Sequence, residues 1–171
     1  MQLQSRRIGL VALVVGIALL STLFSTTQPT AAQAQASPFA GVWELDRFKS
    51  EYDPIATAPQ KQIFTIAPTA TAGEFSFRTR TWRNDVASDT TYNAKFDGAD
   101  YPTSAAQTLV SFKRVNASTV ERTAKLFGEV AETATWTVSA DGKQLTIKRK
   151  GTDTTGMPFS STALYNKTAA S

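Results

Sequence analysis

The chain has 171 residues with 18 basic and 14 acidic side chains, a formal net charge of +4, and neither histidine nor cysteine. The absence of both residue types excludes a disulfide scaffold, thiol chemistry, zinc sites of the usual nitrogen and sulfur kind, and Ser-His-Asp or Cys-His catalysis. The chemistry that remains is that of carboxylates, lysine, tyrosine or serine, an oxygen-ligated metal, or binding without catalysis.

The first 36 residues have the order of a secretory signal peptide. Arg6 and Arg7 precede the apolar run 8–20, and small residues follow up to Ala34 and Ala36, after either of which cleavage is expected. The run is shorter than the ~20 apolar residues that cross a bilayer, although its weaker continuation leaves an uncleaved anchor as the alternative.

Removal of residues 1–36 would leave a single domain over residues 37–171, exported to the periplasm or the extracellular space. Because two arginines are lost with the leader, these 135 residues carry 16 basic and 14 acidic side chains, a net charge of +2. A domain so close to neutral lacks the basic character of nucleic-acid-binding proteins. We therefore expect no nucleic-acid partner and no membrane contact beyond the export signal, and the sequence leaves the oligomeric state undefined.

The rest of the chain consists of short segments in which polar and apolar residues alternate between turn-forming residues. This rhythm, without a long apolar stripe of helical period, predicts an all-β antiparallel domain. The expected strands span residues 41–47, 62–67, 74–83, 90–96, 108–115, 119–126, 130–139, 144–150 and 159–166.

Two Asp-Gly pairs, at positions 97–98 and 141–142, predict tight hairpins of type I′, because Asp and Gly tolerate the positive φ that this turn requires. A two-residue loop at 141–142 would place Trp136 opposite Ile147 and bring the apolar residues of both strands to one face. Residues 49–60 contain two prolines and predict a long crossing loop, with room for one helical turn, at the rim of any pocket.

Arg122 lies on the apolar face of its predicted strand, together with Ala124 and Leu126. A three-residue loop over 127–129 would place Glu132 diagonally across from it, within reach of a long side chain. Two interpretations follow: an ion pair that neutralises itself at one end of the sheet, or an arginine available to the carboxylate of a ligand.

The segment "FAGVWELD", in which Gly41 and Trp43 open the first strand, resembles the start of lipocalins and of the wider calycin superfamily. Together with "KFDGADYPT", "SADGKQLTIKRKGTD" and "ALYNK", it is similar to exported bacterial proteins of unassigned function described as lipocalin-like. The resemblance implies an up-and-down antiparallel β-barrel of about eight to nine strands. It also implies that Trp43 closes one end of the barrel beneath a basic residue of a late strand, Arg149 or Lys167.

Alternation along the strands places most of the large side chains inside such a barrel, where they either fill the core or surround one small ligand. Structural roles fall to Gly41, Trp43, Arg149 and Glu132. The candidate ligand-binding side chains are Arg122, Phe77, Tyr92, Phe96, Phe112 and Trp136.

Three functions remain open. The first is an exported barrel that binds a small hydrophobic or amphipathic ligand, with Arg122 available to an acid. The second is a structural or interaction protein of the cell envelope with a filled barrel and no ligand. The third is a calycin-type isomerase or hydratase, although the sequence contains no catalytic motif. No catalytic residue, metal or cofactor is assigned.

Overall fold

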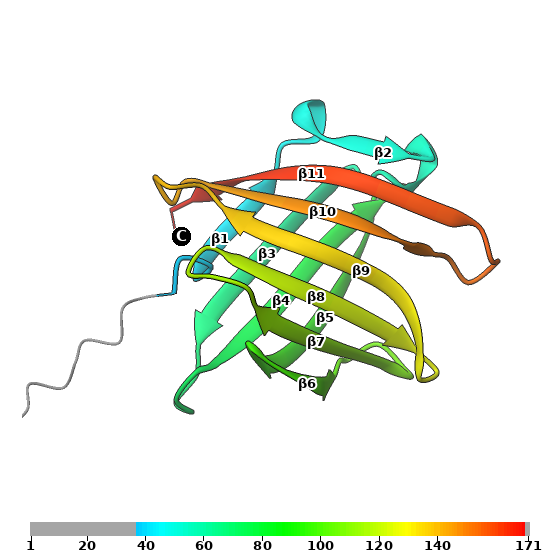
Figure 1. Cartoon of the computed structure of the whole chain (residues 1–171). Coiled ribbons are helices and arrows are strands. Elements are labelled where there is room, and N and C mark those ends of the chain that lie inside the picture. The colour runs from blue at the N-terminus through cyan, green and yellow to red at the C-terminus, as the bar shows by residue number, and fades with distance from the viewer. Residues whose placement is uncertain (1–36, 170–171) are drawn as a thin grey trace, which may run out of the picture. The chain divides into compact units, whose positions relative to one another are not determined.

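Eleven antiparallel strands make up most of the part of the chain that the computed structural model describes, residues 37–169 (Figure 1). The predicted leader lies outside these described residues. Two short 3₁₀ turns, η1 (Arg47–Lys49) and η2 (Ile55–Thr57), flank the second strand. The strands are β1 (Gly41–Leu45), β2 (Glu51–Asp53), β3 (Lys61–Pro68), β4 (Glu74–Arg83), β5 (Val86–Lys95), β6 (Asp97–Pro102), β7 (Thr108–Arg114), β8 (Thr119–Leu126), β9 (Glu129–Val138), β10 (Gln144–Thr152) and β11 (Pro158–Thr168).

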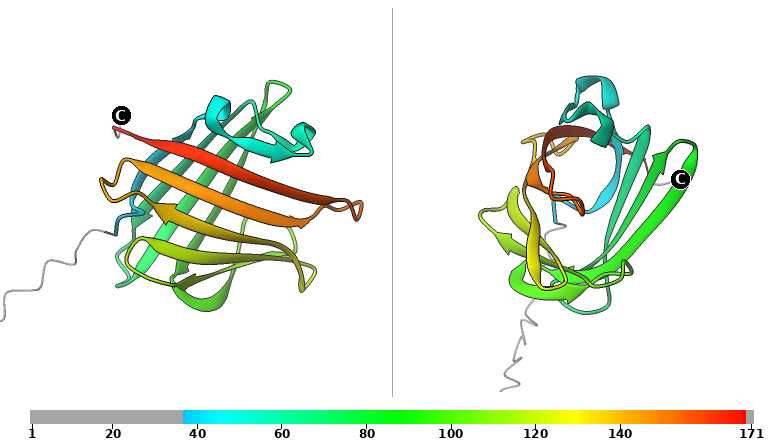
Figure 2. Two further views of the ribbon diagram at one scale, coloured as in Figure 1. Left: turned by 45° about the horizontal axis from the view of Figure 1, so that its top comes forward. Right: turned by 90° about the vertical axis from the view of Figure 1, so that its right-hand side faces the viewer.

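The strands follow one another around a nearly closed barrel, in the order β5-β4-β3-β1-β11-β10-β9-β8-β7-β6 (Figures 1 and 2). Pairing of β1 with β11 joins the two ends of the domain. The seam lies between β5 and β6, where the Ser104 N–H donates to the Thr91 carbonyl at 2.9 Å and the Ser104 hydroxyl accepts from the Thr91 N–H at 2.9 Å. The prediction of an all-β, up-and-down antiparallel barrel is confirmed, with more strands than expected.

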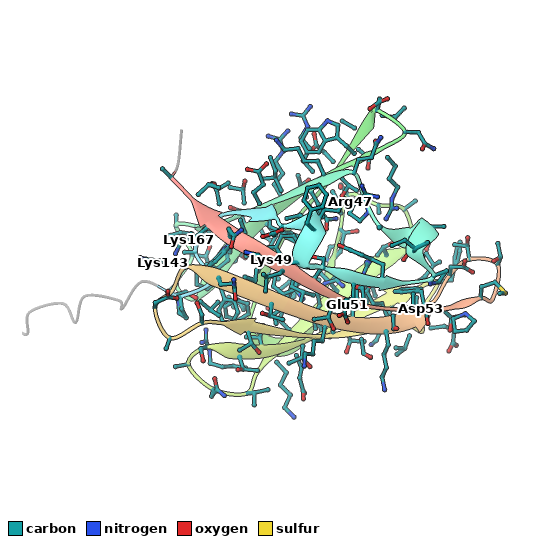
Figure 3. All side chains as sticks on the ribbon, turned by 90° about the horizontal axis from the view of Figure 1, so that it is seen from above. Arg47, Lys49, Glu51, Asp53, Lys143 and Lys167 are labelled. Atoms are coloured by element: carbon teal, nitrogen blue, oxygen red, sulfur yellow. The ribbon has the colours of Figure 1, made fainter. Side chains whose placement is uncertain are left out.

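The two additional strands, β2 and β6, lack the alternation that revealed the others. β2 has three residues, Glu51–Asp53, and pairs with β11 beside β1, so that Tyr52 lies opposite Ser161. It belongs to the segment over residues 49–60 that was expected as a crossing loop with room for one helical turn, and η2 is that turn. The charged residues along η1 and β2 change sign once along the chain: Arg47 and Lys49 on η1 are basic, and Glu51 and Asp53 on β2 are acidic (Figure 3).

The hairpin predicted at residues 97–98 is wrong. Asp97 begins β6, which pairs with β7 and not with β5, so that Asp97 lies opposite Lys113. The Asp97 carboxylate accepts hydrogen bonds from the Ala99 N–H at 2.9 Å and from the Tyr101 hydroxyl at 2.7 Å. These bonds stabilise a bulged corner instead of a turn, which is a common alternative use of an Asp-Gly pair.

The register around residues 141–142 is confirmed, because Trp136 lies opposite Ile147. Only Gly142 has a positive φ there, so the turn is not of type I′. The two-residue turns with positive φ at both positions are Asn84-Asp85 and Phe127-Gly128.

The turn at residues 127–128 is one residue shorter than predicted, and Leu126 lies opposite Glu129. A bulge after Ala124 absorbs the difference, so that Ala124 still faces Glu132 and Arg122 still faces Ala134 as expected.

Trp43 closes one end of the barrel, which we call the closed end. Its side chain is fully buried, and its indole N–H donates to the Phe39 carbonyl at 2.8 Å. The Lys167 ammonium lies 4.9 Å from the ring centre, so Lys167 is the basic residue that the resemblance implies. Gly41 has a φ of 140°, and a Cβ there would meet the Lys167 Cε at 2.5 Å, which explains why glycine precedes the tryptophan by two residues.

Arg149, the other candidate for that position, lies elsewhere, with its guanidinium 5.3 Å from the ring centre of Phe159. Its assignment as the partner of Trp43 is therefore wrong. The reason is the strand register: Arg149 lies opposite Ser161, six residues along β11 from Lys167, which is the residue that pairs with Trp43.

An aromatic layer fills the barrel next to the closed end. The Phe77 ring stacks between Tyr92 and Phe112, with centroid distances of 4.9 Å to each, and Trp136 meets Phe112 edge-on at 5.4 Å. Such offset and edge-on pairs are the favoured geometries of packed aromatic rings. Within residues 37–169, no helix combines the length and apolar character needed to cross a membrane.

Candidate functional site

The interior of the barrel becomes polar with distance from the closed end. Four consecutive strands place Arg122, Ala134, Arg149 and Ser161 directly opposite one another, in a row that crosses β8, β9, β10 and β11. All four side chains lie on the inner face of the sheet, because each residue is two positions away from a buried residue on the same strand. The row therefore brings two guanidinium groups to the interior of the sheet.

Glu132 pairs with both of these arginines. Its carboxylate lies 2.6 Å from the Arg122 Nη1 and 3.4 Å from the Arg149 Nη1, while the Arg149 Nε donates to the Ser161 hydroxyl at 2.8 Å. The side chains of Arg122 and Glu132 are each 17% exposed. Two positive charges thus share one negative charge, and the cluster carries a net charge of +1.

A cavity of about 210 Å³ lies between this cluster and the aromatic layer. Tyr92, Trp136 and Phe64 form its apolar wall, and Arg122, Glu132 and Arg149 lie on its charged side. Further polar side chains line it, namely Gln62, Thr79, Thr81, Thr90 and Tyr165.

Two buried donors of the cavity wall lack an acceptor among the described residues: the Arg122 Nε and the Trp136 Nε1. By contrast, the Tyr165 hydroxyl donates to the Gln62 side-chain oxygen at 2.7 Å. A buried donor without a partner costs free energy, typically 1–3 kcal/mol. Arg122 and Trp136 therefore each keep one hydrogen-bond donor that is not used within the described residues.

Burial and charge keep these groups in defined protonation states. Burial lowers the pKa of the Arg122 guanidinium, but the oxygens of Tyr92 and Glu132 raise it more in sum, and the net pKa lies above its usual value. Burial also raises the pKa of the Tyr92 and Tyr165 phenols. At neutral pH the arginine is charged, both phenols are protonated, and the cavity presents donors.

The sequence-derived candidates divide between the cavity and the packed core. Arg122, Tyr92 and Trp136 line the cavity, whereas Phe77 and Phe112 lie in the aromatic layer beneath it.

Phe96, another candidate, lies nearer the closed end. It is partly buried and packs against Phe39 at a centroid distance of 5.4 Å and against Phe75 at 5.1 Å. It is therefore a core residue outside the cavity. Glu132 and Arg149, which the sequence assigns to structure, are cavity residues.

Sequence reasoning missed the neutral polar lining, although the signal was present. Thr79 and Thr81 share the inward face of β4 with Phe77, and Gln62 shares that of β3 with Phe64. The alternation that identified Arg122 also identifies these residues as polar groups on an apolar face.

A wider groove of about 710 Å³ crosses the outer face of β8–β11 and β2. It runs between two rows of outward side chains, including Thr133, Thr135, Lys148 and Lys150. Threonine and lysine on an exposed strand face are typical of solvated sheets. The interior cavity, with its enclosed and unevenly paired charges, is therefore the stronger candidate for a binding site.

The strand order defines an up-and-down antiparallel β-barrel with a capped tryptophan at its closed end, which is the fold that the resemblance to lipocalins implies. No protein-family model matches the sequence, and no curated protein matches it.

Solved structures with a similar barrel are distant in sequence. The zebrafish ileal bile acid-binding protein complexed with cholic acid is 13% identical, with a TM-score of 0.48 over 77% of this chain and 100% of that one. The bovine odorant-binding protein complexed with undecanal is 13% identical, with a TM-score of 0.42 over 82% of this chain and 77% of that one. The siderocalin Ex-FABP is 12% identical, with a TM-score of 0.37 over 77% of this chain and 71% of that one.

Proposed function

We propose that the barrel binds a small amphipathic acid, with the carboxylate held by Arg122 and the apolar part against the aromatic wall. The observation that carries this proposal is the unequal charge pairing inside the cavity, where Arg122 and Arg149 share the single carboxylate of Glu132. A ligand carboxylate would balance the remaining charge. Its oxygens would also accept hydrogen bonds from the Arg122 Nε and the Trp136 Nε1, which are buried without partners in the described structure.

The size of the cavity limits the ligand. A volume of 210 Å³ corresponds to about seven water molecules and lies below the ~300–1,000 Å³ of pockets for drug-sized ligands. Phe64, Tyr92 and Trp136 offer aromatic surface, which favours a flat or short apolar group. We therefore propose a compact acid, such as an aromatic or short-chain carboxylic acid, over a long-chain lipid.

The aromatic layer keeps a second function open. Phe77, Phe112 and Trp136 pack against one another and leave the closed half of the barrel filled. A barrel that binds nothing and acts as an envelope interaction protein would need only this layer, with the cluster of Arg122, Glu132 and Arg149 left at its net charge of +1. Catalysis fits less well, because both oxygens of Glu132, the carboxylate that lines the cavity, already contact guanidinium groups.

The proposed site of action is outside the cytoplasm, supported by the pattern of basic, apolar and small residues over positions 1–36. Fractionation of cells that express the full chain, compared with a variant lacking residues 2–36, tests this part. We expect an exported and shortened product only from the cells that express the full chain.

The binding proposal is tested by titrating phenylacetate and its neutral analogue phenylacetamide into the protein, with tryptophan fluorescence and calorimetry as readouts. The acid is expected to bind at least tenfold more tightly than the amide, because only the acid pairs with Arg122. Arg122→Met should remove this preference. Arg78→Met is the matched control, since Arg78 lies on the outer face of β4 and pairs with Asp89 at 2.9 Å.

Equal affinity for acid and amide would contradict the role of Arg122. If the folded protein bound neither phenylacetate, phenylacetamide nor a short-chain acid such as hexanoate, the filled-barrel function would replace the binding function.

A further inference from the structure

Exposed apolar side chains gather at the end of the barrel opposite Trp43, which we call the open end. The turns β4–β5, β8–β9 and β10–β11 lie there together with η2, and the right-hand view of Figure 2 faces them. Their exposed apolar residues, which we call the apolar tips, are between 59% and 75% exposed. The apolar tips are Ile55, Val86, Phe127, Val130 and Met157.

The other exposed large apolar residues among those described are Phe48, on η1 at the side of the barrel, and Val115, next to the β7–β8 turn at the closed end. The two ends therefore differ in kind. At the closed end the turns are polar apart from Val115, as in "SADGK" at 139–143. At the open end the turns β4–β5, β8–β9 and β10–β11 and η2 each present at least one large apolar side chain, whereas the β6–β7 loop beside Phe127, residues 103–107, presents none.

Phe127 has a backbone conformation that is unusual for phenylalanine, and its side chain is largely exposed. It has a φ of 52° and is the first residue of the Phe127-Gly128 turn, where Asn, Asp or Gly is usual. Its ring is 75% exposed. A β-hairpin gains nothing from an exposed phenylalanine with positive φ, so this side chain indicates a contact made outside the chain.

The turn that carries Met157 is ordered by its own hydrogen bonds. The Asp153 carboxylate accepts from the Thr155 N–H at 2.9 Å and from the Met157 N–H at 2.9 Å. Met157 is therefore held at the tip by a defined turn.

The charges near the apolar tips are mixed and nearly balanced. Arg83 and Lys150 lie close in sequence to Asp85, Glu129 and Asp153 at the same strand ends. A rim of this kind matches headgroups that carry both signs of charge, and it lacks the single-sign field that a polyanion or an anionic membrane requires.

The apolar tips are also separated from one another, because they belong to different turns with polar neighbours. A protein–protein interface needs a contiguous, desolvated apolar centre, which separate tips do not form. A membrane interface accepts single apolar side chains that enter the boundary between headgroups and acyl chains.

We propose that the open end docks onto a zwitterionic lipid surface through the apolar tips, a membrane contact that the charge and composition of the chain did not predict. The polar row of the barrel lies on the side of the cavity toward this end, so docking would turn the cavity toward the membrane. This proposal goes beyond the binding of an acid and does not depend on it, because the contact is made by turns that contribute nothing to the cavity lining.

The test is flotation of residues 37–171 with phosphatidylcholine vesicles, without added ligand. These residues contain the entire described barrel and its core, and they exclude the predicted leader, which would itself bind lipid. We expect binding that persists between low and high salt, since no charge pairing drives it. Phe127→Asn should weaken the partition coefficient about tenfold, and the triple variant Ile55→Ser, Phe127→Asn, Met157→Thr about a hundredfold or more.

Val115→Ser is the matched control, because it removes an exposed apolar side chain from the opposite end, and it should leave the partition coefficient unchanged. Circular dichroism and thermal unfolding verify that each variant is folded. The proposal is overturned if the wild-type domain does not float with phosphatidylcholine, if Val115→Ser weakens binding as much as Phe127→Asn, or if binding requires anionic lipid and disappears in high salt. Sedimentation that shows a dimer abolished by the triple variant would instead assign the tips to a second copy of the chain.

Discussion

At the scale of single residues, Glu132 decides the charge of the barrel interior. Its carboxylate accepts from Arg122 at 2.6 Å and contacts Arg149 at 3.4 Å. Removal of one member of a buried ion pair leaves the charge of the other member uncompensated. Each of the two arginines therefore needs an acceptor oxygen close to its guanidinium group. A ligand carboxylate and Glu132 therefore compete for the same guanidinium groups.

Glu132→Gln is expected to lower the free energy of unfolding by about 2 kcal/mol and to raise the affinity for phenylacetate, because Arg122 loses its competing partner. Urea unfolding and calorimetric titration measure the two effects. Glu44→Gln is the control, since the 3.0 Å pair of Glu44 with Lys61 is solvent-exposed and its loss should change the unfolding free energy by less than about 0.5 kcal/mol. A weaker affinity in Glu132→Gln would show that the ligand, if any, does not compete with Glu132.

At the scale of elements, close approach of two strands makes a glycine necessary in β10. A Cβ on Gly151 would collide with the Ala131 carbonyl and lie 2.9 Å from the Phe159 ring. Gly151 also faces Glu132 across the β9–β10 ladder. The absence of a side chain at this position therefore permits the strand spacing on which the position of Glu132 depends.

Gly151→Ala is expected to lower the free energy of unfolding by at least about 2 kcal/mol, because β9 must move away from β10. The measurement is urea unfolding. Lys150→Ala, an exposed change at the neighbouring position, should stay within about 0.5 kcal/mol of wild type. Equal stability of Gly151→Ala and Lys150→Ala would mean that the strands accommodate the methyl group without displacement.

In the β8–β9 turn, by contrast, a substitution is expected to stabilise the domain. Phe127→Asn replaces a residue with a φ of 52° by one that adopts positive φ readily, and it should raise the free energy of unfolding by about 1 kcal/mol. Thermal unfolding measures the gain. Such a variant would be more stable and, by the docking proposal, poorer at binding lipid, whereas a loss of stability would indicate that the ring packs on the domain.

The elements also show where sequence reasoning reached its limit. β8 was predicted with its observed bounds, Thr119–Leu126, because its polar and apolar residues alternate without exception apart from Arg122. β2 was not predicted, because three residues carry no usable period, and its strand conformation comes from the neighbouring β11. A pattern of period two detects strands with one buried face and misses those formed by pairing alone.

At the scale of the whole molecule, closure of the barrel buries two tyrosines whose ionisation then couples to folding. Tyr165 is 2% exposed and Tyr92 is 8% exposed, and burial raises the pKa of both phenols above the usual value of 10.0. In the unfolded chain both phenols lose their protons near pH 10, whereas in the folded barrel they keep them to higher pH. Stability from these groups is therefore complete below pH 10 and declines as the pH rises further.

Between pH 8 and pH 11 the free energy of unfolding should fall, by about 1 kcal/mol from Tyr165 and in the same direction from Tyr92. Tyr165→Phe is expected to be less stable at pH 8, because the 2.7 Å hydrogen bond to Gln62 is lost, but to show a smaller decline toward pH 11. Urea unfolding of both proteins at the two pH values measures the difference. Parallel declines would show that Tyr165 ionises in the folded barrel as easily as in the unfolded chain.

Three conclusions follow from the sequence alone: the class of fold, the inward orientation of Arg122 and the exclusion of histidine and cysteine chemistry. Each of these depends only on residue types or on alternation along one strand, which is a local property with a period of two. The pairing of Arg122 with Glu132 was within reach for the same reason, since one hairpin connects the two strands.

Three further features required the three-dimensional structure: which basic residue covers Trp43, how large the cavity is, and that the apolar tips share one end. Lys167 and Trp43 are separated by most of the chain, and their contact depends on the pairing of β1 with β11. The cavity of about 210 Å³ depends on how side chains from seven strands pack together. These features arise from the slant and closure of the barrel, which combine the registers of all its strands and are not encoded in any one of them.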